Sequence, residues 1–312
     1  MEKIGIIGAG LIGRAWAIVF ARAGHVVKMY DADAATVPQA IELIRAALVD
    51  LRAAGLIRES PETVAARITG AATLELAVGD ADYVQESVAE RLEVKRAVLR
   101  QMDIAAPGGC ILASSTSTLP ASAFTAELPG RHRCIVAHPV NPPHIVPVVE
   151  IAAAPWTDAG VVERTRDLQR RVGQTPIIVK REVPGFILNR LQAALLNEAW
   201  RLVKEDYVSV EDLDKVIKDG LGLRWAIMGP FETIDLNAPG GITDYASRYG
   251  PVMQGLMHGV TYEPWDARLV QKIDAERRRI MPQSQHAERE AWRDRRLMAL
   301  IAHKRGWDAK SD

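Results

Sequence analysis

A glycine-rich segment near the N-terminus has the spacing of a dinucleotide-binding turn. Its glycines form the pattern Gly-x-Gly-x-x-Gly between a β-branched segment, 3–7, and an apolar helical segment. The first glycine permits a tight turn, the second lets the backbone approach a pyrophosphate, and the third lets helix and strand pack closely. The N-terminus of the following helix also favours negative charge. We therefore expect this turn to hold a diphosphate through Gly8, Gly10, Leu11, Ile12 and Gly13.

A carboxylate at the end of the next β-branched segment indicates which dinucleotide binds. Asp31 stands 23 residues after Gly8. At this spacing a carboxylate can accept hydrogen bonds from both hydroxyls of the adenosine ribose, and it would repel a 2′-phosphate. The following residues, 32–35, contain no Lys or Arg that would reverse this preference. The sequence therefore predicts NAD, rather than NADP, as the cofactor.

A histidine and a glutamate are candidates for the chemistry. Oxidation of an alcohol requires a base for the hydroxyl proton, and histidine is the side chain whose ordinary pKa is closest to neutrality. Among seven histidines, His138 ends an apolar segment, 134–137, and ligands of doubly wound sheets bind beyond the carboxyl ends of strands. Glu150 lies near the end of the next segment, 146–151. If the two strands are neighbours, its carboxylate can orient the imidazole and stabilise the imidazolium; a purely structural histidine is the alternative.

The surrounding pattern predicts the elements that position these residues. Short apolar segments alternate with helical ones in the first half, which is typical of a parallel sheet covered by helices. Helices are expected over 32–54 and 186–204, where apolar residues recur every three or four positions. Strand signals end at Pro184-Gly185, so we predict a Rossmann-type doubly wound α/β domain over 1–184 and an all-α domain over 185–312. The expected strands are 3–7, 26–30, 83–86, 110–113, 133–137, 146–151 and 177–179.

Composition excludes several other classes of function. The 39 basic and 39 acidic residues balance to zero net charge, so we expect no nucleic-acid or membrane partner. The two cysteines, Cys110 and Cys134, form neither a disulfide framework nor a C-x-x-C pair. We therefore expect a cytoplasmic protein without a metal site, whose partner is a small molecule.

Three further segments carry a family resemblance. Residues 114–119, 134–143 and 184–191 resemble the L-3-hydroxyacyl-CoA dehydrogenase superfamily. Later segments, 198–203, 219–224, 228–233 and 289–294, are similar to the branch that contains λ-crystallin and L-gulonate 3-dehydrogenase. The resemblance spans nearly the whole chain and implies a homodimer formed by the helical domain.

The resemblance also implies residue roles. His138 corresponds to the general base, Glu150 to its partner, and Ser117 and Asn189 to the hydroxyl and amide that hold the reacting oxygen. Asn141 corresponds to a residue near the nicotinamide and the substrate oxygen. Two residues of segment 88–95, Glu90 and Lys95, correspond to residues along the nicotinamide ribose, although a surface pair on a helix would also explain them.

The departures from the family favour a free acid as substrate. The acyl-CoA branch generally ends in a glycine-rich segment, whereas this chain ends in charged helical segments. Arg224 occupies a position where the free-acid branch has an arginine, and a guanidinium can hold a carboxylate by two hydrogen bonds. A dimer-interface ion pair is the alternative for Arg224.

We predict NAD-dependent oxidation of a small L-3-hydroxy acid similar to L-gulonate. The alternative substrates are a short 3-hydroxyacyl-CoA and carnitine, and the alternative of another class is a structural, crystallin-like role. A β-hydroxyacid dehydrogenase with a catalytic lysine is disfavoured. Such enzymes carry that lysine on the helix that enters the second domain, and residues 186–201 contain none.

Overall fold

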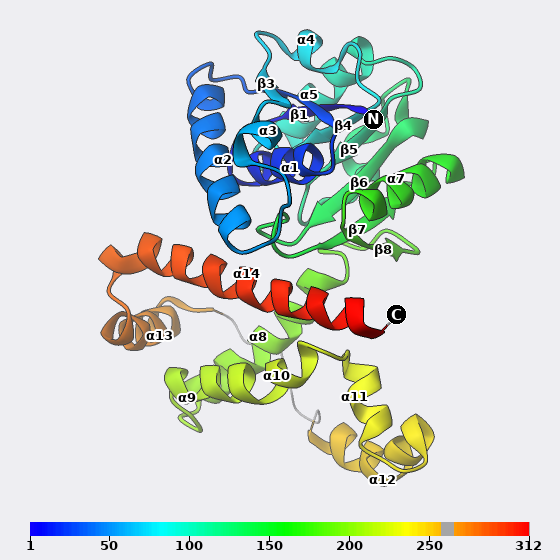
Figure 1. Ribbon diagram of the computed structural model, residues 1–312. Helices are drawn as coiled ribbons and strands as arrows, with labels where there is room; N and C mark the ends of the chain where they lie inside the picture. Colours follow the sequence, from blue (N-terminus) through cyan, green and yellow to red (C-terminus); the bar gives the residue numbers. More distant parts are fainter. Residues whose placement is uncertain (257–264, 312) are drawn as a thin grey trace. The chain divides into compact units, whose positions relative to one another are not determined.

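The N-terminal part of the chain forms one eight-stranded sheet (Figure 1). The computed structural model describes residues 1–256 and 265–311. The strands lie in the order β3-β2-β1-β4-β5-β6-β7-β8, and all neighbours are parallel except β6 and β7. Their bounds are β1 (Lys3–Ile7), β2 (Val26–Tyr30), β3 (Ile68–Gly70), β4 (Tyr83–Glu86), β5 (Ile111–Ser114), β6 (Cys134–Pro139), β7 (Val148–Ala153) and β8 (Thr175–Val179).

Helices cover both faces of this sheet, because its strands present apolar side chains alternately to each side. Ile4 and Ile6 of β1 join one buried cluster with α1, α2 and α7. Ile7 joins a second cluster with α4, α5 and α6. The last helix adds Met298 to the first cluster. The helices are α1 (Leu11–Arg22), α2 (Thr36–Ala53), α3 (Pro61–Ala65), α4 (Leu74–Val78), α5 (Leu92–Ala105), α6 (Ala121–Thr125), α7 (Ala159–Arg171) and α14 (His286–Ser311), with a 3-10 turn at Arg131–Arg133.

The expected α/β architecture is confirmed, with two differences. The seven expected strands are present within two residues of the predicted bounds. The sequence did not reveal β3, which has three residues and buries only Ile68. A uniformly parallel sheet is wrong at one place, since β7 runs antiparallel to β6. The eight residues between them, 140–147, are too few for the crossover of a dozen or more residues that a parallel connection requires.

The chain divides into two compact units, which are described separately. Unit 1 comprises Met1–Arg190 and Glu290–Asp312, and unit 2 comprises Leu191–Arg289. Within its described residues unit 2 is helical, and no described strand follows β8. The domain bounds at 184 and 185 stay a prediction, and residues 257–264 and 312 lie outside the described part. The later elements are α8 (Leu188–Lys204), α9 (Val210–Lys215), a π-helical turn (Val216–Leu221), α10 (Gly222–Trp225), α11 (Pro230–Leu236), α12 (Gly241–Leu256), α13 (Ala267–Ile280) and a 3-10 turn (Gln283–Gln285).

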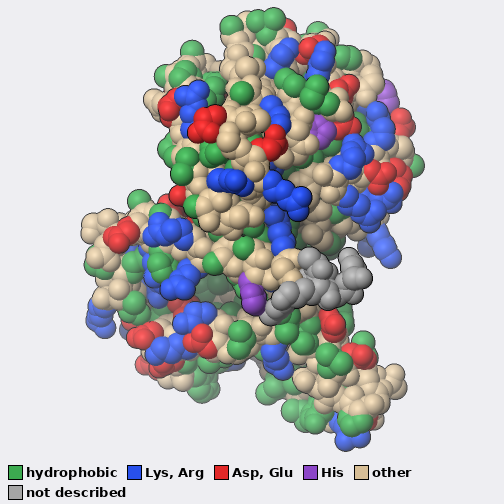
Figure 2. Space-filling model, viewed as in Figure 1, with side chains coloured by type: hydrophobic (Ala, Val, Ile, Leu, Met, Phe, Trp, Pro, Cys, Tyr) green, Lys and Arg blue, Asp and Glu red, His purple; other side chains and the backbone are tan. Residues whose placement is uncertain are grey.

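The surface and the helices bear on possible partners. Figure 2 shows acidic and basic side chains interspersed over the face in view. None of the described helices combines the length and the apolar character that a membrane crossing requires. Over residues 1–256 and 265–311, no group of three or more His, Cys, Asp or Glu side chains is arranged to hold a metal ion.

Candidate active site

The glycine turn between β1 and α1 is held in a conformation that only glycine tolerates. Gly8 has a φ of +97°, and a Cβ there would lie 2.6 Å from the carbonyl oxygen of Ser87. A Cβ on Gly13 would lie 1.8 Å from the carbonyl oxygen of Gly8. At Gly10 a Cβ would meet no atom within 4 Å, so the backbone is open on that side. Gly10 caps α1 without a side-chain hydrogen bond, which leaves the first N–H groups of the helix, those of Leu11 and Ile12 included, available to an anion.

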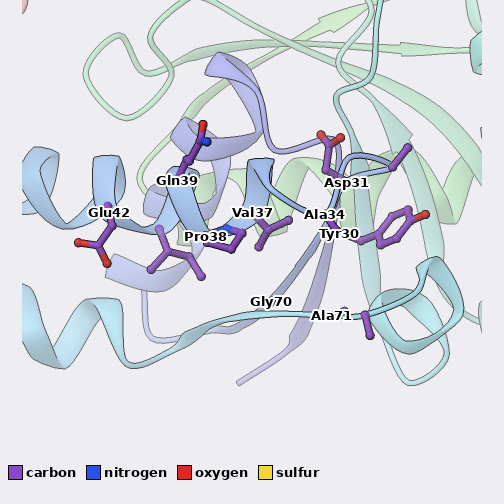
Figure 3. A pocket seen from close by; sticks show the side chains of 12 residues that line it. Tyr30, Asp31, Ala34, Val37, Pro38, Gln39, Glu42, Gly70 and Ala71 are labelled. Atoms are coloured by element: carbon purple, nitrogen blue, oxygen red, sulfur yellow. The ribbon is translucent and has the colours of Figure 1, made fainter.

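Asp31 lies directly beside this turn. Its carboxylate accepts hydrogen bonds from the N–H of Ala9 at 2.8 Å and of Asp33 at 3.0 Å. It also lines a pocket of about 730 Å³ between the start of α2 and the end of β3 (Figure 3). The lining contains the carboxylates of Asp31 and Glu42 and no Lys or Arg. These residues fit the adenosine end of NAD and offer no counter-charge to a 2′-phosphate.

His138 and Glu150 face each other across the antiparallel pair of strands. They are register partners on β6 and β7, and the Nδ1 atom of His138 lies 2.9 Å from Oε2 of Glu150. Both side chains are buried, with exposed fractions of 6% and 2%. A carboxylate only accepts hydrogen bonds, so Nδ1 carries the proton and the lone pair of Nε2 is left for another partner. Glu150 is the third residue of its strand, not near the end as expected, because β7 spans Val148–Ala153. It still lies opposite His138, near the end of β6, because the two strands are antiparallel.

The second oxygen of Glu150 anchors the start of α8. Oε1 accepts hydrogen bonds from the N–H groups of Ile187 at 2.8 Å and Leu188 at 3.0 Å. Burial alone would raise the pKa of Glu150, but the hydrogen bonds from His138, Leu188 and Ile187 outweigh it and hold the pKa below its ordinary value. Glu150 therefore stays ionised near neutrality, between the imidazole and the helix N-terminus.

Asn189 and Ser117 are in direct contact. The Nδ2 atom of Asn189 donates to the carbonyl oxygen of Ser117 at 2.8 Å. Both residues are half-buried. Among the described residues the Ser117 hydroxyl has no hydrogen-bond partner, and Asn189 Nδ2 has a second N–H. Two donors are therefore available on residues that contact each other, and Asn189 directly follows the helix start that Glu150 anchors.

Glu90 holds the loop that carries Ser117. Its Oε1 atom accepts hydrogen bonds from the N–H groups of Ser117 at 2.9 Å and Thr118 at 3.0 Å, and from the Thr116 hydroxyl at 2.6 Å. Burial alone would raise the pKa of Glu90, but the Thr116 hydroxyl, the Lys95 charge and the two N–H groups hold it below its ordinary value. The loop is thereby tied to the segment that follows β4.

Lys95 is buried beneath this loop. Its side chain is 1% exposed, and Nζ lies 3.0 and 3.2 Å from the two carboxylate oxygens of Glu86 and 3.2 Å from Oε2 of Glu90. These contacts match the three donors of an ammonium group. The expected binding of the nicotinamide ribose by Glu90 and Lys95 stays a prediction, and Glu90, with 38% of its side chain exposed, is the more accessible of the two.

The remaining predicted residues, Asn141 and Arg224, take part in none of the contacts described above. Asn141 is exposed in the loop after β6, three residues beyond His138. Arg224 is exposed on α10 in unit 2. Their roles toward a substrate stay predictions.

Two models of one protein family match nearly the whole chain. The 3-hydroxyacyl-CoA dehydrogenase NAD-binding domain matches residues 3–183, and the 3-hydroxyacyl-CoA dehydrogenase C-terminal domain matches residues 185–279. The chain belongs to the 3-hydroxyacyl-CoA dehydrogenase family. The part that carries the glycine turn and His138 is therefore an NAD-binding domain, which confirms the predicted cofactor class.

Curated proteins and a solved structure are similar to this chain, with λ-crystallin among them. The λ-crystallin of Oryctolagus cuniculus is 40% identical over 311 residues, covering 96% of this chain and 95% of its own. An L-carnitine dehydrogenase of Streptomyces coelicolor is 35% identical over 277 residues, covering 88% of this chain and 84% of its own. A solved structure described as 5-formyl-3-hydroxy-2-methylpyridine-4-carboxylic acid 5-dehydrogenase, an NAD⁺-dependent dismutase, has a TM-score of 0.83 at 30% identity, covering 96% of this chain and 97% of its own.

Two residues of this family site were not found by sequence reasoning. Glu86 is fully buried at the end of β4 and accepts hydrogen bonds from Lys95 and from the N–H of Val88. A charged residue at the end of an expected strand was the available signal, because a charged group is buried only with partners. Phe186 is fully buried against His138. The preceding Pro184-Gly185 indicated a turn, but a residue pattern does not reveal a ring contact.

Proposed function

We propose that this protein is an NAD-dependent dehydrogenase that oxidises the 3-hydroxyl of a small free L-3-hydroxy acid, similar to L-gulonate, to the 3-keto acid. The observation that carries the proposal is the 2.9 Å contact between Nδ1 of His138 and Glu150, because in the neutral imidazole it leaves the lone pair on Nε2, where it can accept a proton. The Ser117 hydroxyl and the second N–H of Asn189 Nδ2 add two donors for a substrate oxygen. Glu150 anchors the start of the helix that carries Asn189, and Asn189 contacts Ser117.

In this mechanism, bound NAD supplies the hydride acceptor. His138 Nε2 takes the hydroxyl proton while Glu150 fixes the ring and stabilises the imidazolium. The Ser117 hydroxyl and the Asn189 amide hold the substrate oxygen, and Asn141 lies near it and the nicotinamide. The base must be neutral to accept a proton, so oxidation rises with pH over the range in which an imidazole is deprotonated, and reduction falls over the same range.

The preference for NAD over NADP is assigned to Asp31. Its carboxylate and the absence of Lys or Arg from the adjoining pocket disfavour a 2′-phosphate. Comparison of kcat/KM for the two cofactors tests this assignment. Asp31→Ala should lower the ratio of kcat/KM for NAD to kcat/KM for NADP. Equal kcat/KM values for the two cofactors in the wild type would contradict the assignment.

The choice of a free acid depends on Arg224 and on the similar proteins. Arg224 would hold the carboxylate by paired hydrogen bonds. A relative is named for L-carnitine and a similar structure for a pyridine carboxylic acid. A panel of gulonate, 3-hydroxybutyrate, carnitine and 3-hydroxybutyryl-CoA, each with NAD, tests the substrate class. Turnover of the CoA ester far above every free acid would overturn this assignment, and turnover of none would favour a structural role.

We also propose a cytoplasmic homodimer formed by the helical unit. Several large apolar side chains of unit 2 are exposed, among them Phe231 at 73%, Leu236 at 67% and Val252 at 62%. Exposed apolar area of this kind marks interaction surfaces. Both cysteines are free thiols, which is usual in a reducing compartment. Sedimentation at micromolar concentration tests the assembly, and a 34.2 kDa species would refute the dimer.

A further inference from the structure

An aromatic ring packs against the His138 imidazole in a tilted arrangement. The ring centroids of His138 and Phe186 are 5.4 Å apart, and their planes are inclined by 37°. Phe186 is fully buried in the apolar cluster on this side of the sheet. We propose that Phe186 is a positioning residue for His138, whose ring fixes the plane of the imidazole so that Nε2 stays directed at the substrate oxygen. This inference rests on the proposed role of His138 as the base.

The hydrogen bond to Glu150 does not by itself fix the imidazole plane. It constrains the direction of Nδ1, but the terminal torsion of a histidine side chain has a broad energy profile. A ring packed on one face restricts that torsion, since dense packing leaves no room for rotation. His138 is then held at Nδ1 by Glu150 and packed against the ring of Phe186.

The backbone around Phe186 shows that its position is imposed by the surrounding structure. Phe186 has a φ of +48°, which is uncommon for a residue with a Cβ. Such conformations persist where the surroundings over-determine them, and they concentrate at functional sites. The two residues after Phe186 donate their N–H groups to Oε1 of Glu150. The carboxylate that directs Nδ1 therefore also anchors the turn that presents the Phe186 ring.

The neighbouring residues extend this arrangement to the substrate side. The N–H of Gly185 donates to the carbonyl oxygen of Thr118 at 3.3 Å, and Asn189 donates to that of Ser117 at 2.8 Å. The segment 185–189 thus contacts the base, its carboxylate and the Ser117 loop. The phenyl ring also places an apolar group against the imidazole.

Phe186→Leu separates positioning from general packing. Leucine keeps an apolar side chain and removes the ring face. We expect kcat to fall about two- to tenfold, the size associated with one ring contact, with the Kd for NADH within twofold of the wild type. Phe124→Leu is the matched control, because Phe124 is a buried phenylalanine of the same cluster. It should lower the thermal midpoint comparably and leave kcat within twofold of the wild type.

A double variant gives the decisive measurement. If Phe186 acts through His138, Phe186→Leu should lower kcat in the wild type and have no further effect in a His138→Asn background. Phe186→Tyr keeps the ring and should restore most of the lost kcat. If Phe186→Leu fails to fold, Phe186→Met takes its place in the same comparison.

The outcomes distinguish this inference from the proposed function. The positioning role would be overturned if Phe186→Leu had the same kcat as Phe124→Leu. It would also be overturned if Phe186→Leu lowered kcat by the same factor in the wild-type and His138→Asn backgrounds. Near-wild-type turnover in His138→Asn would instead overturn the proposed base, whatever Phe186→Leu does. A large loss in His138→Asn without any loss in Phe186→Leu leaves the proposed function standing and rejects only Phe186.

Discussion

Two buried charge clusters lie in the same sheet domain, and they differ in what they leave free. His138 and Glu150 meet through one nitrogen of the imidazole, so Nε2 keeps its lone pair. Lys95 donates hydrogen bonds to both carboxylate oxygens of Glu86 and forms an ion pair with Glu90. The first cluster offers an atom that could exchange a proton with a substrate, whereas in the second the Lys95 side chain is 1% exposed and its ammonium is paired within the protein. Burial of a charged group therefore does not by itself indicate catalysis. A buried group is a better candidate when one of its polar atoms is left free to bond a substrate.

The largest expected effect is the loss of turnover in His138→Asn. A general base contributes about 10²- to 10⁴-fold in rate, so kcat should fall by that factor. NADH titration should still show binding, because the glycine turn and Asp31 are unchanged. Near-wild-type turnover would transfer the role elsewhere. His144 is the first residue to examine, although burial, then Arg22 and Arg14, lower its pKa to about 4.

Removal of the second cluster's cation should act on stability. Lys95→Met leaves the buried Glu86 carboxylate without its counter-ion, which typically costs about 3–5 kcal/mol in the free energy of unfolding. Urea unfolding followed by circular dichroism measures this loss. Lys28→Met is the matched control, because the Lys28–Asp80 ion pair is exposed and should contribute only about 0–1 kcal/mol. Equal losses of unfolding free energy in Lys95→Met and Lys28→Met would contradict the expectation that the buried ion pair contributes more than the exposed one.

Arg224 contrasts with the buried Lys95, because it is exposed and its proposed partner is the substrate carboxylate. A hydrogen bond to a charged group contributes about 1.5–3 kcal/mol, so Arg224→Met should raise KM for the free acid about ten- to a hundredfold. The midpoint of urea unfolding should stay near that of the wild type. An unchanged KM together with a shift toward monomer in sedimentation would assign Arg224 to the dimer interface instead.

The smallest expected effect is a pH-dependent contribution of Glu150 to stability. Its pKa is lowered in the folded protein, so this contribution is fully present above the unfolded pKa of about 4.3 and is lost as pH falls through the folded pKa. The unfolding free energies of wild type and Glu150→Gln should differ by about 1–2 kcal/mol at pH 7. The difference should shrink below about pH 4. Urea unfolding at several pH values measures it, and a constant difference would contradict the ionised role of Glu150.

Much of the nucleotide-binding part could be predicted because its signals are local. The glycine spacing, the strand before it and Asp31 lie within the first 31 residues. Gly8 is required by its φ of +97° and Gly13 by a contact within the turn, where a Cβ would collide with the carbonyl oxygen of Gly8. Such constraints act over short stretches of chain, so they leave a readable pattern. The strand bounds follow in the same way from apolar, β-branched segments.

The sequence by itself therefore determined the fold class, the NAD-binding turn and the residue types available for chemistry. Only the tertiary structure decided that β7 runs antiparallel to β6, which makes Glu150 the register partner of His138. It also decided that Lys95 is enclosed by two carboxylates and that Phe186 packs on the imidazole. Strand register, burial and ring packing depend on which distant segments meet, and that is set by the free energy of the whole packed core rather than by any local run of residues.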